Sequence, residues 1–215
     1  MFRWKVKPVL YWIAAMILCP LGVALCAKSG FGVSMIEAPV YVLHLFLHQF
    51  WSWFTFGTSE YVVQALLLIG LCVYLRRFHP WYLLSFVTAF LYGQVLDLWY
   101  LLIGAGTFAT MVGRIAGLAA GTLLNTLAVA LFFRTWMPPE VWELVVKQIA
   151  GVKKYNITKV KWVYDISSLS VGMILMLVFF RGWRWDVVGV GSLVTTLVNA
   201  PLIAFFGRRL DRWFR

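Results

Sequence analysis

Charged and amide side chains interrupt the apolar runs of this sequence at a few isolated positions. Asp97 lies about six residues from the end of one apolar run, and Arg114 lies at a comparable depth at the start of the next. An ionisable group inside lipid costs about 2.5 kcal/mol or more, so such groups usually face the bundle interior and pair. We expect an Asp97–Arg114 ion pair, joined by Gln64. It is either an outer polar site for a substrate or a coupling proton, or a structural pair that fixes helix order.

Metal binding and catalysis find little support in the sequence. His44 and His48 are four residues apart, so both can share a helical face and bind a metal, but no third ligand with credible spacing accompanies them. There is no nucleotide-binding loop, no HExxH or GxSxG motif and no nucleophile–base pair. We expect no metal site, no cofactor and no enzymatic activity.

The composition of the chain predicts the helices that position these residues. The chain has 215 residues, 62% of them hydrophobic and 13% charged. A soluble fold of this size cannot bury so much apolar surface, so the sequence predicts an all-α integral membrane protein forming a single membrane domain, 1–215. A span takes roughly 20 residues. Six runs qualify, the second one extended by a helix cap at Thr58 or Ser59: 9–27, 60–75, 80–103, 111–133, 162–180 and 187–206.

Positive charge predicts the orientation of these spans. If there are six, fifteen of the 19 Lys and Arg residues fall on one side, in both tails and in the loops after the second and fourth spans. Basic loops remain in the cytoplasm, so both termini are expected there. Because the charge of +11 is confined to short loops and tails, we do not expect nucleic-acid binding.

The two halves of the sequence resemble each other. Residues 21–28 read LGVALCAK and residues 127–134 read LAVALFFR. We interpret 9–103 and 111–206 as two repeats. Each contains three spans, an odd number, so the repeats must enter the membrane in opposite senses, as inverted repeats of transporters do.

Polar positions of the two repeats correspond in order. The matches are Glu37 with Glu143, Gln64 with Asp165 to within one residue, and Asp97 with Asn199. By the inversion, the second set should lie near the inner face. One polar cluster near each face is what two alternating-access gates require, although duplication without function leaves the same pattern.

Two shorter segments and a glycine face complete the expected architecture. Residues 35–51 and 139–150 are amphipathic and too short or too polar to span, so we expect interfacial or re-entrant helices, one on each face. Gly113, Gly117 and Gly121 recur every four residues and form a smooth helix face. Such faces let helices approach closely, which predicts tight packing within the protein or, alternatively, a dimer interface.

The stretch LGVALCAKSGFGVSMIEAPVYVL resembles the opening of the YczE/YyaS/YitT-like family of bacterial multi-span membrane proteins. The positions that carry the resemblance are Lys28, Gly32, Val33, Ser34 and Glu37. Residues 35–36 depart from the usual Pro-Trp pair. The resemblance implies a location in the bacterial cytoplasmic (inner) membrane. It supplies neither a substrate nor a site residue.

Two functions remain open from the sequence. The first is a membrane transporter, or a membrane-embedded substrate-binding subunit, for a small organic molecule bound where the two inverted repeats meet. The second is a structural or regulatory membrane protein that assists a partner complex. Its basic loop, 147–161, would dock that partner or anionic lipid.

Overall fold

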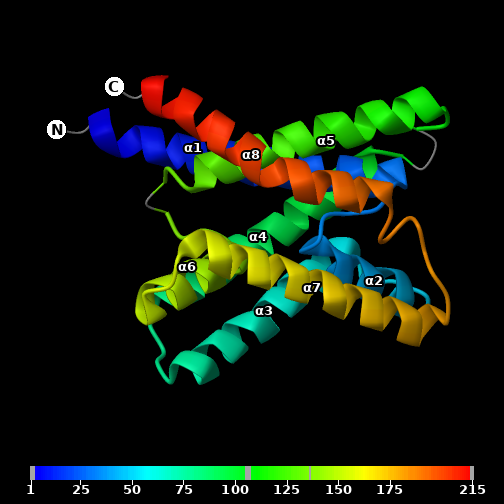
Figure 1. Ribbon diagram of the computed structural model, residues 1–215, viewed down its shortest axis with the longest axis horizontal. Coiled ribbons are helices and arrows are strands. Elements are labelled where there is room, and N and C mark those ends of the chain that lie inside the picture. The colour runs from blue at the N-terminus through cyan, green and yellow to red at the C-terminus, as the bar shows by residue number, and fades with distance from the viewer. Residues whose placement is uncertain (1–2, 105–107, 136, 214–215) are drawn as a thin grey trace. The chain divides into compact units, whose positions relative to one another are not determined.

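A computed structural model describes residues 3–104, 108–135 and 137–213 of the chain (Figure 1). Within them the chain forms eight α-helices and no strand. In chain order they are α1 (Arg3–Ser29), α2 (Glu37–Leu47), α3 (Phe56–Leu75), α4 (Trp81–Leu102), α5 (Met111–Phe132), α6 (Val141–Lys153), α7 (Ile157–Phe180) and α8 (Val190–Trp213). The all-α class predicted from composition is confirmed.

Six of these helices are long and apolar enough to cross a membrane: α1, α3, α4, α5, α7 and α8. They overlap the six predicted runs, with the largest differences at the start of α1, which begins at Arg3 and not at 9, and at the end of α8, which ends at Trp213 and not at 206. The predicted cap of the second span was wrong, because α3 begins at Phe56 and its N-cap is Thr55. The Thr55 hydroxyl accepts a hydrogen bond from Thr58 N at 3.1 Å, which satisfies one of the free amides of the first turn. The earlier start places Glu60 well inside the helix.

The order of long and short helices is the same in both halves of the chain. Helices α1 to α4 run long, short, long, long, and α5 to α8 repeat that order. The short helices α2 and α6 match the segments predicted at 35–51 and 139–150. Most of α2 and most of the first half of α6 are buried within the protein.

The described residues pack as two compact units, and each unit takes segments from both sequence halves. Unit 1 comprises Met1–Ser34, Val95–Met137 and Arg184–Arg215. Unit 2 comprises Met35–Gln94 and Pro138–Trp183. The helix α4 contributes its second part to unit 1 and its first part to unit 2.

Unit 1 is held together by the crossing of α1 and α5. At the crossing, a Cβ on Gly22 would lie 2.6 Å from Gly121 O, and a Cβ on Gly121 would lie 2.6 Å from Gly22 O. Both positions therefore need glycine for the two backbones to approach. This contact gives Gly121 the packing role within the protein that its helix face predicts.

The segment that follows α1 in unit 1 is fixed by hydrogen bonds to the start of α8. Val33 N donates to Val187 O at 3.0 Å, and Ser192 Oγ donates to Val33 O at 2.5 Å. Gly32 has φ +101°, a conformation that side chains with a Cβ rarely adopt, and a Cβ there would collide with Ser192 Oγ. The glycine of the GVS sequence is thus required by this turn.

Unit 2 brings the two short helices together with α3 and α7. The helix α2 packs against α3 and α7, and α6 packs against the same two helices (Figure 1). A Cβ on Gly172 of α7 would lie 2.8 Å from Ala38 Cβ, so the first turn of α2 lies directly on α7. The buried glutamates of unit 2 lie at the starts of α2 and α6 and in the second turn of α3.

Candidate functional site

One face of α3 positions the first part of the site. Glu60, Gln64, Leu68 and Leu71 recur at intervals of four and three residues and so share that face. The first two side chains are completely buried, an unusual environment for a carboxyl and an amide. Buried polar groups of this kind need hydrogen-bond partners, and here they come from the start of α6.

Gln64 uses both ends of its amide to join α3 to α6. Its Nε2 donates to Glu60 Oε1 at 2.9 Å and to Glu140 Oε2 at 3.3 Å. Its Oε1 accepts from Val141 N at 2.9 Å. That amide is one of the free donors at the first turn of α6, so Gln64 caps the helix from outside.

Glu60 is the meeting point of three elements. Trp142 of α6 donates its indole Nε1–H to Glu60 Oε1, the same oxygen that accepts from Gln64. A side-chain hydrogen bond also joins Glu60 to Glu37, the first residue of α2. Glu60 Oε2 and Glu37 Oε2 are both buried, and among the described residues neither has a hydrogen-bond partner.

Four buried carboxyl groups therefore gather in unit 2, and we call them the acidic cluster: Glu37, Glu60, Glu140 and Glu143. Glu143 lies on its α7 side. Its charge acts on Lys147 of α6 and on Lys161 and Asp165 of α7. Lys161 Nζ also pairs with Asp165 Oδ1 at 2.9 Å along the helix.

The acidic cluster favours bound protons. Burial raises the pKa of Glu37 well above its ordinary value, and the negative charges of the other three carboxyls raise it further. Burial likewise raises the pKa of Glu140, with Glu143 and Glu60 adding to the effect. The pKa of Glu143 is raised by burial too, against the opposing charges of Lys161 and Lys147.

The dipoles of the two short helices oppose the effect of burial on these pKa values. Glu37 is the first residue of α2, and Glu140 is the N-cap of α6. The positive end of a helix dipole favours a negative charge within the first turn. The helix dipoles therefore oppose the effect of burial on the pKa values of Glu37 and Glu140.

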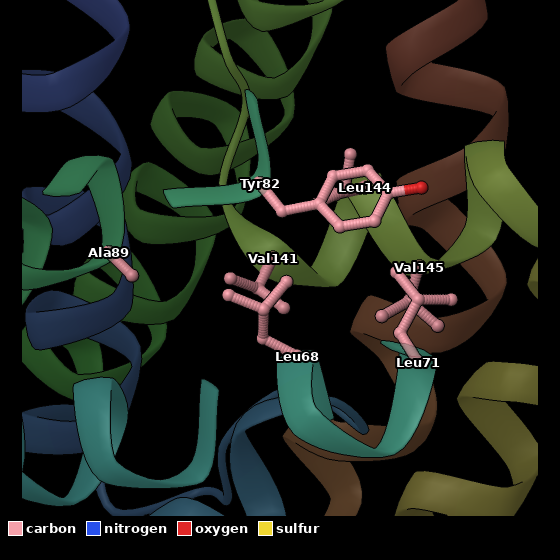
Figure 2. Close-up of a cluster of buried hydrophobic side chains, with 7 residues drawn as sticks. All are labelled: Leu68, Leu71, Tyr82, Ala89, Val141, Leu144 and Val145. Atoms are coloured by element: carbon pink, nitrogen blue, oxygen red, sulfur yellow. The ribbon is translucent and has the colours of Figure 1, made fainter. Parts of the chain in front are cut away.

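An apolar cluster borders the acidic cluster along α3 and α6. It contains Leu68, Leu71, Tyr82, Ala89, Val141, Leu144 and Val145. Figure 2 shows the side chains of α3 and α6 facing each other, with Tyr82 from α4 beside them. Because Val141 directly follows Glu140, and Leu68 lies one turn beyond Gln64, the carboxyls are closed off by hydrocarbon on this side.

Aromatic rings border α2 and the start of α3. The Tyr41 and Phe56 ring centroids are 5.1 Å apart, and those of His44 and Phe56 are 5.7 Å apart. Tyr41 and His44 follow Glu37 on one face of α2. His44 Nδ1 and His48 Nδ1 lie 3.3 and 3.2 Å from the carbonyl of Phe54, so each ring must donate there. In the described part of the chain, no set of three or more His, Cys, Asp or Glu side chains is placed to hold a metal.

The site residues predicted from the sequence fall into two groups. Glu37, Gln64, Glu143 and Asp165 come together in unit 2, so the prediction that they form two separate clusters, one near each face, was wrong. Asp97, Arg114 and Asn199 belong to unit 1.

In unit 1, Arg114 closes the end of α1. Its Nε donates to Ser29 O at 2.6 Å and its Nη2 to Gly30 O at 3.0 Å, so the guanidinium satisfies carbonyls at a helix C-terminus. The guanidinium also lies 4.7 Å from the Phe31 ring centroid. The pairing of Arg114 with Asp97 stays a prediction. Asn199 Oδ1 is buried and, among the described residues, has no hydrogen-bond partner.

Gly113 and Gly117 of α5 lie beside the aromatic ring of Phe108, which belongs to the same unit. A Cβ on Gly117 would come within 2.7 Å of the Phe108 ring, and one on Gly113 would lie 3.7 Å from that ring. Together with Gly121 against α1, these contacts account for the smooth face of α5 without a second copy of the chain.

The sequence reasoning missed Glu60 and Glu140. Glu60 stands at the predicted boundary of its span, and Glu140 follows Pro138-Pro139, so both looked like solvated ends of helices. The spacing of these residues from other polar residues could have revealed them. Glu60 and Gln64 are four residues apart and Glu140 and Glu143 three apart, which places each pair on one helix face.

Six helices that are long and apolar enough to cross a membrane define a multi-pass α-helical membrane protein. Residues 6–208 match a family described as a family of unknown function, DUF6198, and the chain belongs to that family. It is also 22% identical over 206 residues to the uncharacterized protein YyaS of Bacillus subtilis (strain 168), covering 95% of this chain and 94% of the relative. The resemblance to YyaS-like proteins is confirmed. No solved structure matches the chain.

Proposed function

We propose that the protein is a membrane transporter, or the membrane-embedded substrate-binding subunit of one, for a small organic molecule bound at the acidic cluster. The observation that carries this proposal is the burial of four carboxyls from both halves of the sequence in one place. Buried ionisable groups in membrane proteins mark substrate and proton pathways more often than structural cores.

Unsatisfied polar atoms support a binding role over a purely structural one. A structural network of carboxyls should satisfy its oxygens, because each unpaired buried polar atom costs about 1–3 kcal/mol. Here Glu37 Oε2, Glu60 Oε2 and Tyr164 OH are buried without a partner among the described residues. All three belong to unit 2, and the charges of Glu60 and Glu143 act on Tyr164. They are the atoms a ligand would contact.

Two inverted repeats are part of the proposal. The halves share the same order of long and short helices, and their contacts correspond: α2 packs on α7 as α6 packs on α3. A matched pair of hydrogen bonds adds to this. Thr88 Oγ1 of α4 donates to Pro138 O before α6, and Ser192 Oγ of α8 donates to Val33 O before α2. Three spans per repeat would place α2 and α6 as re-entrant helices entering from opposite faces.

The proposed location is the bacterial cytoplasmic membrane with both termini inside the cell. The distribution of Lys and Arg supports this orientation. A reporter fused to the C-terminus, active only in the cytoplasm, should be active. Activity of a periplasmic reporter there would overturn the orientation.

The test of function is ligand-dependent stability of the purified protein. Wild type, Glu60→Gln and Asp186→Asn are melted in detergent against a panel of amines, guanidines, amino acids, vitamins and inorganic cations. Asp186 is the control, because it is half exposed and pairs with Arg184 in unit 1. A ligand of the folded state raises the melting temperature by mass action. We expect a concentration-dependent shift in wild type and Asp186→Asn that is absent in Glu60→Gln. A shift unchanged in Glu60→Gln, or no shift with any compound, would refute a binding site at the acidic cluster.

A partner-assisting role is the second candidate, favoured by exposed lysines at the end of α6, in the turn after it and at the start of α7. Lys153, Lys154 and Lys159 are exposed and offer positive charge to a partner protein or to anionic lipid. The predicted basic loop 147–161 is mostly helical, and its Lys147 in α6 and Lys161 in α7 act on Glu143 instead. Replacing the three exposed lysines with Gln should abolish association with a partner complex under this role and leave transport unchanged under the first.

A further inference from the structure

We propose that the ligand of the acidic cluster is a small organic cation carrying N–H donors, an ammonium or a guanidinium, and that its binding displaces a proton. This inference rests on the proposed function and names its substrate class and coupling. Charge, hydrogen-bond chemistry and the surrounding rings each support it.

Negatively charged groups surround Glu37. The charges that act on it are those of the other three carboxyls of the acidic cluster. Those that act on Glu140 are also carboxyls, Glu143 and Glu60. The basic side chains Lys147 and Lys161 act on Glu143, at the α7 side. Several carboxylates cannot ionise together in an apolar interior unless a cation joins them.

Hydrogen-bond chemistry selects the kind of cation. Glu37 Oε2 and Glu60 Oε2 are two vacant acceptors on carboxyls that are hydrogen-bonded to each other. Ammonium and guanidinium groups present several N–H donors, and a guanidinium can bind two carboxylate oxygens at once. Tyr164 OH, also unpartnered among the described residues, is a third contact point.

Aromatic rings favour an organic cation over a bare metal ion. Trp142 is fixed by its indole hydrogen bond to Glu60, and its ring centroid lies 6.3 Å from that of Tyr164. Indole and phenol faces attract organic cations. The described residues, by contrast, contain no group of three or more His, Cys, Asp or Glu side chains placed for a metal. The set of side chains thus fits a cationic group attached to a small hydrocarbon body.

Proton exchange follows from conservation of charge in the site. Without ligand, protons on the carboxyls keep the buried cluster close to neutral. When a monovalent cation enters, one carboxyl loses its proton, so the net charge stays constant: one positive charge enters and one proton leaves. The facing groups are Glu37 from α2, Glu60 from α3, Glu140, Glu143 and Lys147 from α6, and Lys161, Tyr164 and Asp165 from α7.

The test uses methylguanidinium and benzylguanidinium, with the full chain in proteoliposomes that enclose a pH-sensitive dye. Guanidinium groups stay charged at all pH values used, so they do not cross lipid as neutral bases and raise the internal pH by themselves. Adding either probe outside should draw protons out and raise the internal pH in wild type and Asp186→Asn. Glu60→Gln should abolish the change. Retained folding of the variant is checked by its melting temperature and its elution as a single species.

Binding in detergent gives the second measurement. Calorimetric titrations in two buffers of different ionisation enthalpy report the protons released, and one proton per bound cation is expected. Affinity should rise about tenfold per pH unit while the site is protonated. Binding without proton release overturns the coupling, and flux that survives Glu60→Gln overturns the site. If the panel reveals a neutral or anionic ligand lost in Glu60→Gln while both guanidines fail to bind, the cation class is wrong and the proposed function stands. If no compound of either set binds, both fail.

Discussion

Gln64 on α3 donates a hydrogen bond at 3.3 Å to Glu140, which stands 76 residues further along the chain at the start of α6. The same amide reaches Glu60 and accepts from the backbone of Val141. One neutral side chain thus holds two carboxyls and a helix start in a fixed arrangement. The site depends on this residue more than on any single ion pair.

Replacing Gln64 with Leu should destabilise the protein by about 1–3 kcal/mol for each polar group left without a partner. The shape is nearly kept, but Glu140 and Val141 N lose their partner in a buried place. Melting temperature in detergent measures the loss. The matched control is Gln49→Leu, since Gln49 is exposed and its side chain donates to Leu45 O at the end of α2. Equal melting temperatures for the two variants would contradict the assigned role of Gln64.

Trp142→Phe should weaken ligand binding and lower stability by roughly 1–2 kcal/mol. The substitution keeps an aromatic ring but removes the indole N–H that donates to Glu60, leaving a buried carboxyl oxygen with one donor fewer. Trp162→Phe is the control, because Trp162 on α7 is exposed. A ligand-induced melting shift of normal size in Trp142→Phe would argue against Trp142 as part of the site.

Stability should fall as pH rises above the ordinary glutamate pKa of 4.5. The folded-state pKa values of Glu37 and Glu140 are raised, so the folded protein binds more protons than the unfolded chain. Their contribution is therefore fully present below pH 4.5 and is lost progressively as pH climbs toward the raised pKa values.

The measurement for this prediction is the melting temperature as a function of pH for wild type and Glu37→Gln. Glutamine cannot titrate, so the variant should show a shallower decline over the same range. Asp211→Asn serves as control, since Asp211 is exposed and pairs with Arg134. Parallel curves for wild type and Glu37→Gln would show that Glu37 is ionised normally.

The crossing of α1 and α5 should not tolerate a side chain. Gly121→Val places carbon atoms against Gly22 O, from which even a Cβ would be only 2.6 Å away, and backbone atoms cannot move aside cheaply. Overpacking of this kind typically costs about 1–3 kcal/mol. Gly70→Val is the control, because a Cβ on Gly70 meets no atom within 4 Å. Melting temperatures that fall equally in both variants would indicate that the loss comes from placing valine in a helix, and not from the contact between α1 and α5.

The matched hydrogen bonds of the proposed repeats make a further prediction. Thr88→Val and Ser192→Ala each remove a hydroxyl that donates to a carbonyl at a turn before a short helix. Each should cost about 1 kcal/mol, because each substitution removes a side-chain hydrogen bond to a main-chain carbonyl. A loss seen in one variant alone would weaken the correspondence between α4 and α8.

Periodicity and composition were sufficient to predict the spans, because a hydrocarbon environment demands long apolar helices whatever their packing. The pairing of α2 with α7 and of α3 with α6 could not be read from those patterns, since it is decided by side-chain fit. For that reason Glu37, Gln64 and Glu143 were identified as polar positions without showing that they meet. Glu60 was missed because a boundary error of four residues in α3 moved a buried carboxyl to the apparent surface.

Under the proposed function, the acidic cluster holds protons in an apolar site that a cation can occupy. Hydrophobic carbodiimides react with protonated carboxyls in apolar surroundings, so peptide mass spectrometry after labelling at pH 7 tests this directly. We expect adducts at Glu37, Glu60 or Glu140 that methylguanidinium suppresses, and none at Asp186 or Asp211, which are half exposed and exposed, respectively. Labelling spread over the exposed carboxyls, or adducts in the cluster that no cation protects, would contradict this proposal.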